Sequence, residues 1–188
     1  MIFIVGHHNT GKTSLAKALI PFGFLHVETA DIVRMIHKKI SYNIDFHKWA
    51  SEHKHQFDNF IIDEILKARE KILESVDNLQ DVIITGNRQL SGILSIIRKV
   101  SPIGKRENII IFLDANPKEL FRRQMVREDR LIPTLSFEQF VKDFLEYDKE
   151  MGIEEIREKA DFIVDANKPK EEVFESVRKI LKQRGYKV

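Results

Sequence analysis

The residues best suited to chemistry lie near the start of the chain, in the segment GHHNTGKT at positions 6–13. This segment fits G-x-x-x-x-G-K-[ST], the pattern of a phosphate-binding loop, or P-loop. Gly6 and Gly11 carry no Cβ, so the backbone can turn tightly and approach a phosphate closely. Backbone N–H groups at a helix start then face the anion, and the helix dipole favours its negative charge. The segment therefore predicts a site for a nucleoside triphosphate.

Two side chains at the end of the loop have expected tasks in that site. Lys12 is expected to reach the β- and γ-phosphates and to act in catalysis, and the Thr13 hydroxyl is expected to hold Mg²⁺. A guanine site would favour an N-K-x-D motif, whereas residues 167–170 read NKPK and lack the aspartate, so we expect ATP. The other loop residues assigned to nucleotide binding are Gly6, Asn9, Thr10, Gly11 and Ser14.

The segments beside the loop have the character that such a site requires. The run IFIV at positions 2–5 is apolar and contains two β-branched isoleucines, which is typical of a buried parallel strand. Good helix formers follow from Ser14 to Ile20, and the pattern ends at Pro21. The order of strand, loop and helix disfavours a chance match of the motif in an ordinary βα turn.

Apolar runs and helical patterns alternate along the rest of the chain. Expected strands cover 2–5, 22–27, 81–85, 108–114 and 161–165. Expected helices cover 32–39, about 60–76, 90–100, 117–130, 137–159, with a break near Gly152 as an alternative, and 169–183. We predict an α/β fold of three layers, with a five-stranded parallel sheet, helices on both faces and right-handed crossovers. Ligands of such sheets bind beyond the carboxyl ends of the strands, where four residues are expected to meet: Gly6, Glu28, Gly86 and Asp114.

The composition limits the class of protein. A length of 188 residues suits a single domain, 1–188, and the contents of 43% apolar and 32% charged residues are typical of a soluble globular protein. A formal net charge of +2 gives no indication of a nucleic-acid partner, and no apolar run approaches a membrane span. The first apolar run is too short for a signal peptide, and the chain has no cysteine. We therefore expect a cytoplasmic protein.

A cluster of arginines after the fourth expected strand is suited to binding phosphate. Arg123 and Arg127 are four residues apart and so share one face of a helix. Their guanidinium groups could bind phosphate oxygens of donor and acceptor and stabilise the transferring phosphoryl group. The alternative is an ordinary solvated helix end, with Glu128 and Asp129 compensating the charge.

Residues for the phosphate acceptor are expected after the second and third strands. Asp31 could orient an acceptor hydroxyl or serve as a general base, although it also suits an ordinary helix N-terminus. Thr29, Arg34 and Arg88 are assigned to acceptor binding, the two arginines because they can pair with an anionic acceptor. The polar, histidine-rich residues 41–57 show no clear pattern and are interpreted as part of a helical flap on the acceptor side.

Together these residues resemble the nucleoside monophosphate kinase and dephospho-coenzyme A kinase branch of the P-loop proteins. TADIVR at 29–34 resembles the T-G-D-x-x-R segment of adenylate kinases, with alanine in place of glycine. The spacing L-x-x-R-x-x-x-R from Leu120 to Arg127 is similar to the segment before the lid of these kinases. Residues 160–167 look like the last strand and the adenine-side loop, which implies a nucleotide contact for Asn167. TGNR at 85–88 and the segment 137–152 resemble archaeal-type nucleotide kinases.

The resemblance implies a kinase with a helical acceptor-binding region at about 30–78 and a short lid at about 127–137. It implies transfer of the γ-phosphate of Mg–ATP to a small phosphorylated acceptor, a nucleoside monophosphate or dephospho-coenzyme A. One departure concerns magnesium: Thr85 stands where many members carry an acidic residue, so Mg²⁺ must rely on Thr13 with Glu28 or Asp31. The alternatives are a nucleotide-dependent switch or assembly ATPase with a protein partner, and an ATP-binding protein with little turnover.

Overall fold

A computed structural model of the protein describes residues 1–40, 43–45, 49, 52–53, 57–75, 78–100, 106–127 and 135–188. Most of the histidine-rich segment 41–57 lies outside the described residues. So do residues 128–134 of the expected lid, which include Arg130. The expectations for these parts of the chain therefore remain predictions.

The centre of the fold is a parallel sheet of five strands, as the alternation of apolar runs predicts. Its order is β2-β3-β1-β4-β5, with β1 in the middle. The four residues of β1 are fully buried because helices cover both faces of the sheet, which explains their continuous apolar character. The strands are β1 (Ile2–Val5), β2 (Phe24–Glu28), β3 (Asp81–Thr85), β4 (Ile109–Asp114) and β5 (Phe162–Asp165).

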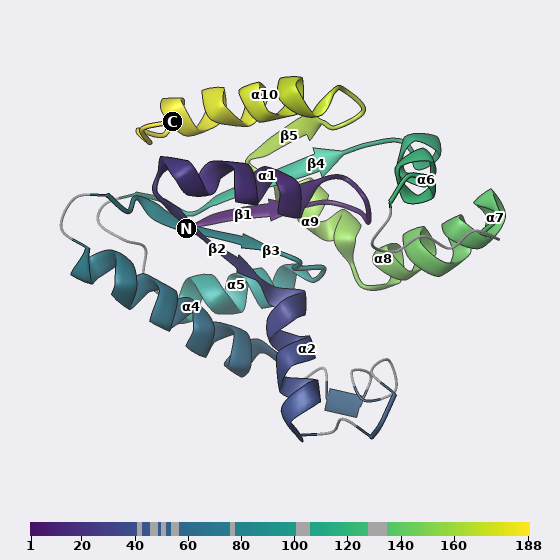
Figure 1. Cartoon of the computed structure of the whole chain (residues 1–188), viewed down its shortest axis with the longest axis horizontal. Helices are drawn as coiled ribbons and strands as arrows, with labels where there is room; N and C mark the ends of the chain where they lie inside the picture. Colours follow the sequence, from purple (N-terminus) through teal and green to yellow (C-terminus); the bar gives the residue numbers. More distant parts are fainter. Residues whose placement is uncertain are drawn as a thin grey trace.

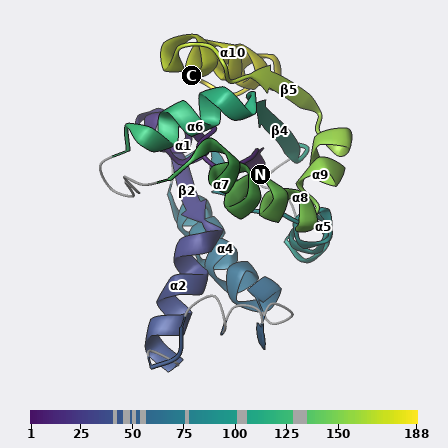
Figure 2. The same ribbon diagram turned by 90° about the vertical axis from the view of Figure 1, so that its right-hand side faces the viewer.

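Helices form the two outer layers (Figure 1). One face carries α1 (Lys12–Leu19), α6 (Pro117–Met125), α7 (Phe137–Phe140) and α10 (Lys170–Gln183). The other face carries α2 (Thr29–Ile40), α4 (Phe57–Glu74), α5 (Leu90–Lys99) and α9 (Ile153–Lys159). Figure 2 shows α2 and α4 extending together away from the sheet. Further helical segments in the described part of the chain are η1 (Ile20–Phe22), the π-helix η3 (Val141–Glu146) and α8 (Tyr147–Glu150).

Alternate residues of β1 belong to different cores, as the period of a strand requires. Phe3 and Val5 pack with α2, α4, α5 and α9, while Ile2 and Ile4 pack with α1, α6 and α10. No helix within the described ranges is long and apolar enough to cross a membrane.

Several element boundaries differ from the sequence-based expectation. The second strand runs to Glu28, and α2 begins at once at Thr29 instead of Ile32. The helix expected over 117–130 ends at Met125. The helix expected over 137–159 is divided into four segments: the π-helix η3 lies inside it, and the alternative of a break near Gly152 is confirmed, with a φ of +95° at that residue. Glycine permits that backbone angle at little cost, and local sequence alone gives little sign of a π-turn.

A buried carboxylate joins the amino end of β3 to the last residues of the chain. Asp81 is fully buried, and its Oδ2 accepts a hydrogen bond from the Tyr186 hydroxyl while its Oδ1 accepts one from the backbone N–H of Val82. Burial and the charge of Asp81 raise the pKa of Tyr186, so the phenol stays protonated and remains a donor.

Replacing Tyr186 with phenylalanine is expected to lower the free energy of unfolding by about 2 kcal/mol, since it removes one hydrogen bond to a buried charge. Urea denaturation of the variant measures this loss. Tyr147→Phe, at an exposed tyrosine, is the matched control and should change the stability by less than about 0.5 kcal/mol. Equal losses in the two variants would contradict the assigned role of the Tyr186 hydroxyl.

Candidate active site

The phosphate-binding loop connects β1 to α1 and has the backbone conformation that its glycines predict. Gly6, Asn9 and Gly11 have φ values of +148°, +62° and +92°. A Cβ on Gly6 would lie 2.4 Å from the carbonyl oxygen of Leu113, so no larger residue fits there without displacing β4. The hydroxyl of Thr10 donates to the carbonyl of His7 at 2.9 Å and closes the loop.

Lys12 lies folded against this loop. Its Nζ donates to the carbonyl oxygens of Gly6 and His7 and to the hydroxyl of Thr10 at 2.8, 2.5 and 3.3 Å. Burial, and next the positive charge of Arg88, lower the pKa of Lys12 to about 8. Because little negative charge balances the Lys12 ammonium group, binding of an anion such as phosphate beside it is favourable.

Four side chains at the carboxyl ends of β2 and β3 and the start of α1 form a chain of hydrogen bonds. The hydroxyls of Thr13 and Thr85 both donate to Oε2 of Glu28, each at 2.8 Å. The single hydroxyl proton of Thr85 is used in that bond, so the 2.7 Å contact between Thr85 and Nε2 of His26 requires an N–H on the imidazole. Burial lowers the pKa of His26.

This arrangement fits Mg²⁺, which prefers oxygen ligands and is commonly held by one or two protein groups together with phosphates and water. Thr13 and Glu28 supply a hydroxyl and a carboxylate in direct contact. The parallel register pairs Glu28 with Thr85, so the acidic group that Thr85 lacks is present on the neighbouring strand. Gly86 beside it has a φ of +93°, and a Cβ there would lie 2.2 Å from Oε1 of Glu28, so a larger residue would be strained and would displace the carboxylate.

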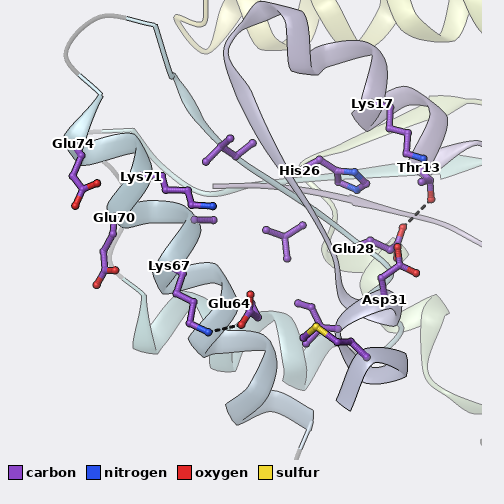
Figure 3. A pocket seen from close by; sticks show the side chains of 15 residues that line it. Thr13, Lys17, His26, Glu28, Asp31, Glu64, Lys67, Glu70, Lys71 and Glu74 are labelled. Carbon is purple, nitrogen blue, oxygen red and sulfur yellow. Dashed lines mark hydrogen bonds and ion pairs between the residues drawn. The ribbon is translucent and has the colours of Figure 1, made fainter. Parts of the chain in front are cut away.

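A cavity of about 740 Å³ begins at this oxygen pair and runs along β2 towards α4 (Figure 3). Thr13, Glu28 and Asp31 border one end, and the charged face of α4 borders the other. The volume is that of a small-molecule site. The charged and histidine side chains that line the cavity are Lys17, His26, Glu28, Asp31, Glu64, Lys67, Glu70, Lys71 and Glu74.

The residues expected after β2 differ in their placement. Asp31 lines the cavity and pairs with Arg34 at 2.8 Å across one turn of α2, on the exposed surface. Thr29 is buried, and its hydroxyl lies beside Gly86. The structure thus brings Asp31 to the cavity and holds Arg34 against Asp31.

Arg123 of α6 and Arg127, which follows the end of that helix, both reach the phosphate-binding loop, although α6 ends too early for them to share a helix face as expected. Arg123 donates to Glu119 at 2.8 Å and to the carbonyl of Ala166 at 2.6 Å, with longer bonds to the carbonyls of residues 9 and 10 at 3.4 and 3.5 Å. Arg127 donates to Oδ1 of Asn9 at 2.9 Å. The Asn9 amide in turn donates to Gln124 of α6 at 2.9 Å. In the described structure these contacts attach α6 to the loop.

The last two nucleotide-binding candidates lie apart from each other. Asn167 follows β5, and its Oδ1 accepts from the backbone and side chain of Asn116 at the start of α6 at 2.9 and 2.7 Å. Its own amide groups donate to Asp165. Ser14 is exposed in the first turn of α1. Asp114, at the end of β4, pairs with Arg157 at 2.9 Å instead of joining the oxygen pair at Glu28.

Glu119 is held by two arginines, which makes a pH prediction possible. The hydrogen bond from Arg122 and the charge and hydrogen bond of Arg123 lower the pKa of Glu119 from 4.5 to about 2, although burial opposes the shift. A carboxyl whose pKa is lowered by folding stabilises the protein above its unfolded pKa, and this contribution is lost as the pH falls from 4.5 to about 2.

Glu119→Gln is therefore expected to lower the free energy of unfolding at pH 7 by up to about 1 kcal/mol, a small effect because water screens the pair. The difference from wild type should shrink when denaturation is repeated near pH 2. The exposed Glu155→Gln on α9 is the control and should show no such pH-dependent difference. A Glu119→Gln effect of equal size at both pH values would contradict the assigned ion pairs.

Arg88 also reaches the loop, and it brings with it a residue that the sequence did not reveal. It donates to Oδ1 of Asp148 at 2.7 Å and to Nε2 of His8 at 2.8 Å. Asp148 lies in α8 with only 1% of its side chain exposed. One signal was present: Phe140, Phe144 and Asp148 are spaced by four and so share a helix face, which places a carboxylate in line with two apolar side chains.

Comparison with solved structures shows which fold this is. A shikimate kinase from Bacteroides thetaiotaomicron matches with a TM-score of 0.60 and 17% identity, over 96% of this chain and 97% of that one. TT1252 from Thermus thermophilus gives 0.62 and 16%, over 97% and 96%. A gluconokinase from Sinorhizobium meliloti 1021 gives 0.59 and 18%, over 98% and 93%. The fold is thus shared with a shikimate kinase and a gluconokinase over almost the whole chain.

Comparison by sequence finds similarity over a smaller part of the chain than comparison by structure does. No curated protein is similar enough in sequence to match the chain. A family model described as an AAA domain, AAA_24, matches residues 1–118, which include β1, the phosphate-binding loop, Glu28 and Arg88. Because that match covers more than half of the chain, the protein belongs to the AAA_24 family of AAA domains.

Proposed function

We propose that the protein is an ATP-dependent phosphotransferase that moves the γ-phosphate of ATP to a small molecule. The observation that carries this proposal is the junction of three features: the phosphate-binding loop with Lys12, the Thr13–Glu28 oxygen pair, and a cavity of about 740 Å³ that begins at that pair. The fold shared with a shikimate kinase and a gluconokinase supports it.

In this proposal the loop residues bind and orient the triphosphate. The backbone N–H groups at the start of α1 face the phosphates, and Lys12 exchanges its bonds to the loop carbonyls for bonds to phosphate oxygens. Thr13 and Glu28 would hold Mg²⁺, which when bound neutralises charge on the phosphates. Asn167 lies on the loop after β5 and is proposed to contact the nucleotide there.

The residues on the acceptor side have separate tasks. Asp31 borders the cavity close to Glu28, where it can orient an acceptor hydroxyl or accept its proton. Arg123 and Arg127 are proposed to stabilise the transferring phosphoryl group, because their guanidinium groups already lie against Asn9 of the loop. The segments 30–78 and 127–137 are proposed as acceptor-binding region and lid, whose closure would exclude water.

For the acceptor we propose a nucleoside monophosphate first and dephospho-coenzyme A second. The support is the resemblance of residues 29–34 to the acceptor segment of adenylate kinases, and the position of Arg88 beside the loop. A guanidinium group that is 30% exposed can pair with the phosphate of such an acceptor. Thr29 and Arg34 are proposed to line the same side.

The test is ADP release from Mg–ATP with each acceptor in turn. The panel contains the ribo- and deoxyribonucleoside monophosphates, dephospho-coenzyme A, shikimate and gluconate, and Lys12→Ala is the blank. Acceleration by one acceptor, absent in the blank, is the expected result. A slow rate that no acceptor changes would reject the phosphotransferase. It would point instead to a nucleotide-dependent switch with a protein partner, or to an ATP-binding protein with little turnover.

A further inference from the structure

Asp148 is a buried carboxylate beside the phosphate-binding loop, and the proposed reaction assigns it no task. Both oxygens of Asp148 are engaged: Oδ1 accepts from Arg88 at 2.7 Å, and Oδ2 accepts from the backbone N–H and the ring Nδ1 of His8 at 2.8 and 2.9 Å. Burial would raise the pKa of Asp148, but the nearby rings of His7 and His8 and the charge of Arg88 hold it well below its usual range. The group is therefore a permanent anion that touches the loop.

The contacts define the proton positions on His8. A guanidinium group has only donors, so the 2.8 Å contact of Arg88 with Nε2 requires that this nitrogen accept. The proton of the neutral ring is then on Nδ1 and is donated to Asp148. Burial lowers the pKa of His8 and keeps the ring neutral, and Phe144 packs against it edge-to-face with 5.1 Å between centroids. The His8 ring thus forms a second, indirect connection between Arg88 and Asp148 through its two nitrogens.

Arg88 is fixed by three neighbours. Besides Asp148 and His8, the ring of Tyr147 lies under its guanidinium carbon at 5.3 Å from the centroid. Tyr147 and Asp148 begin the helix that follows the π-helix η3, and such irregular turns re-aim the side chains beyond them. In the described contacts Arg88 uses only two of its five N–H groups, so it can still bind an anion.

Lys12 and Arg88 both bond residues of the loop, and their positive charges repel each other. The charge of Arg88 is among the causes that lower the pKa of Lys12, and the charge of Asp148 opposes it. Without Asp148, Arg88 would lose a bond and its counter-charge, and its lowest-energy position would be farther from Lys12. Asp148 therefore keeps Arg88 close to the loop as a second cation. The N–H groups of Arg88 that bond neither Asp148 nor His8 stay available.

We propose that Asp148 is a positioning residue for phosphoryl transfer, which holds Arg88 beside the phosphate-binding loop directly and through His8. The inference rests on the proposed phosphotransferase function. Asp148 itself touches no phosphate in this account; it acts through the guanidinium group of Arg88. Displacement of Arg88 should lower kcat more than it weakens ATP binding, because ATP binding depends on the loop backbone and Lys12.

The kinetic test compares Asp148→Asn with Asp143→Asn, an exposed aspartate of η3 that accepts a hydrogen bond from Gln139. Asp148→Asn is expected to lower kcat about 100-fold and to change the KM for ATP by less than about threefold. Adding Arg88→Gln to Asp148→Asn should give no more loss than Arg88→Gln alone, because both changes remove one interaction. Additive losses, or a kcat for Asp148→Asn equal to that of the control, would overturn the proposal.

A second readout does not depend on activity. Two-dimensional ¹⁵N spectra of the histidine rings, with His8 assigned through His8→Gln, should show the Nδ1–H tautomer in wild type and in Asp143→Asn. The signal should change in Asp148→Asn. A wild-type His8 protonated on Nε2 would overturn the placement of Asp148 even if the kinase activity is present. Wild-type spectra as expected, with no acceptor-dependent turnover, would instead reject the proposed function and leave the contact intact.

Thermal melting shows whether Asp148→Asn folds. If it does not, His8→Gln is the second kinetic variant, because glutamine cannot connect Arg88 and Asp148 as the ring does. Its kcat is expected to fall about tenfold with the KM for ATP unchanged. An unchanged kcat in that variant would overturn the inference.

Discussion

Replacing Lys12 with alanine is expected to lower kcat for phosphoryl transfer about a thousandfold, the largest effect of any single substitution in this site. The ammonium group lies on the loop carbonyls of Gly6 and His7, where it can move to the phosphates with little rearrangement. No other lysine of the described chain makes these loop contacts. Steady-state kinetics with Mg–ATP and the preferred acceptor measure the loss.

The control for this substitution is Lys118→Ala, at an exposed lysine in the first turn of α6. It should keep wild-type kinetics, and circular dichroism should show that both variants fold. A Lys12→Ala protein that retains a tenth or more of the wild-type kcat would contradict the assigned role of the loop in catalysis.

Glu28→Gln is expected to lower turnover about 100-fold at millimolar Mg²⁺, since the variant keeps the shape of the side chain and loses its charge. The carboxylate is the only acidic group among the described residues that bonds Thr13. Raising the Mg²⁺ concentration should recover part of the activity if the defect is in metal binding. Titration of Mn²⁺ with ATP present, followed by electron paramagnetic resonance, should show weaker metal binding in the variant.

The matched control is Glu70→Gln, because Glu70 lines the same cavity at its α4 end, away from Thr13. It should leave the metal titration unchanged. A Glu28→Gln protein with wild-type Mn²⁺ affinity would contradict the magnesium site, and Asp31 would then be the acidic group to test.

The fold and the conformation of the phosphate-binding loop follow from local sequence. The strand 2–5, the loop glycines and the helix after them depend on residues that are adjacent in the chain, so their types are sufficient to predict them. The order of strands and helices then leads to the parallel sheet. The boundaries were less exact, as for α2, which begins three residues before the expected position.

The carboxylate proposed for magnesium binding is identified only by the register of two strands. Sequence reasoning noted that Thr85 lacks an acidic group and named Glu28 or Asp31 as substitutes. Only the pairing of Glu28 with Thr85 across β2 and β3 shows which carboxylate bonds Thr13. Side chains from different strands meet through that register, and a single sequence does not contain it.

Asp148 shows the limit of prediction from sequence. It bonds His8 and Arg88 across 140 and 60 positions of the chain. The irregular helix before it changes which side chains face the loop. Such a contact depends on how the helical segments from Phe137 to Glu150 pack in the fold, which a single sequence does not contain.

The measurement that tests the central claim most directly uses ATP labelled with ³²P in the γ-position. The protein is incubated with labelled Mg–ATP and the acceptor that most accelerates ADP release, and the products are separated. We expect the label on the acceptor in amounts equal to the ADP formed, and none on the acceptor with Lys12→Ala. Label recovered only as inorganic phosphate would show hydrolysis without transfer, and would contradict the assignment as a phosphotransferase.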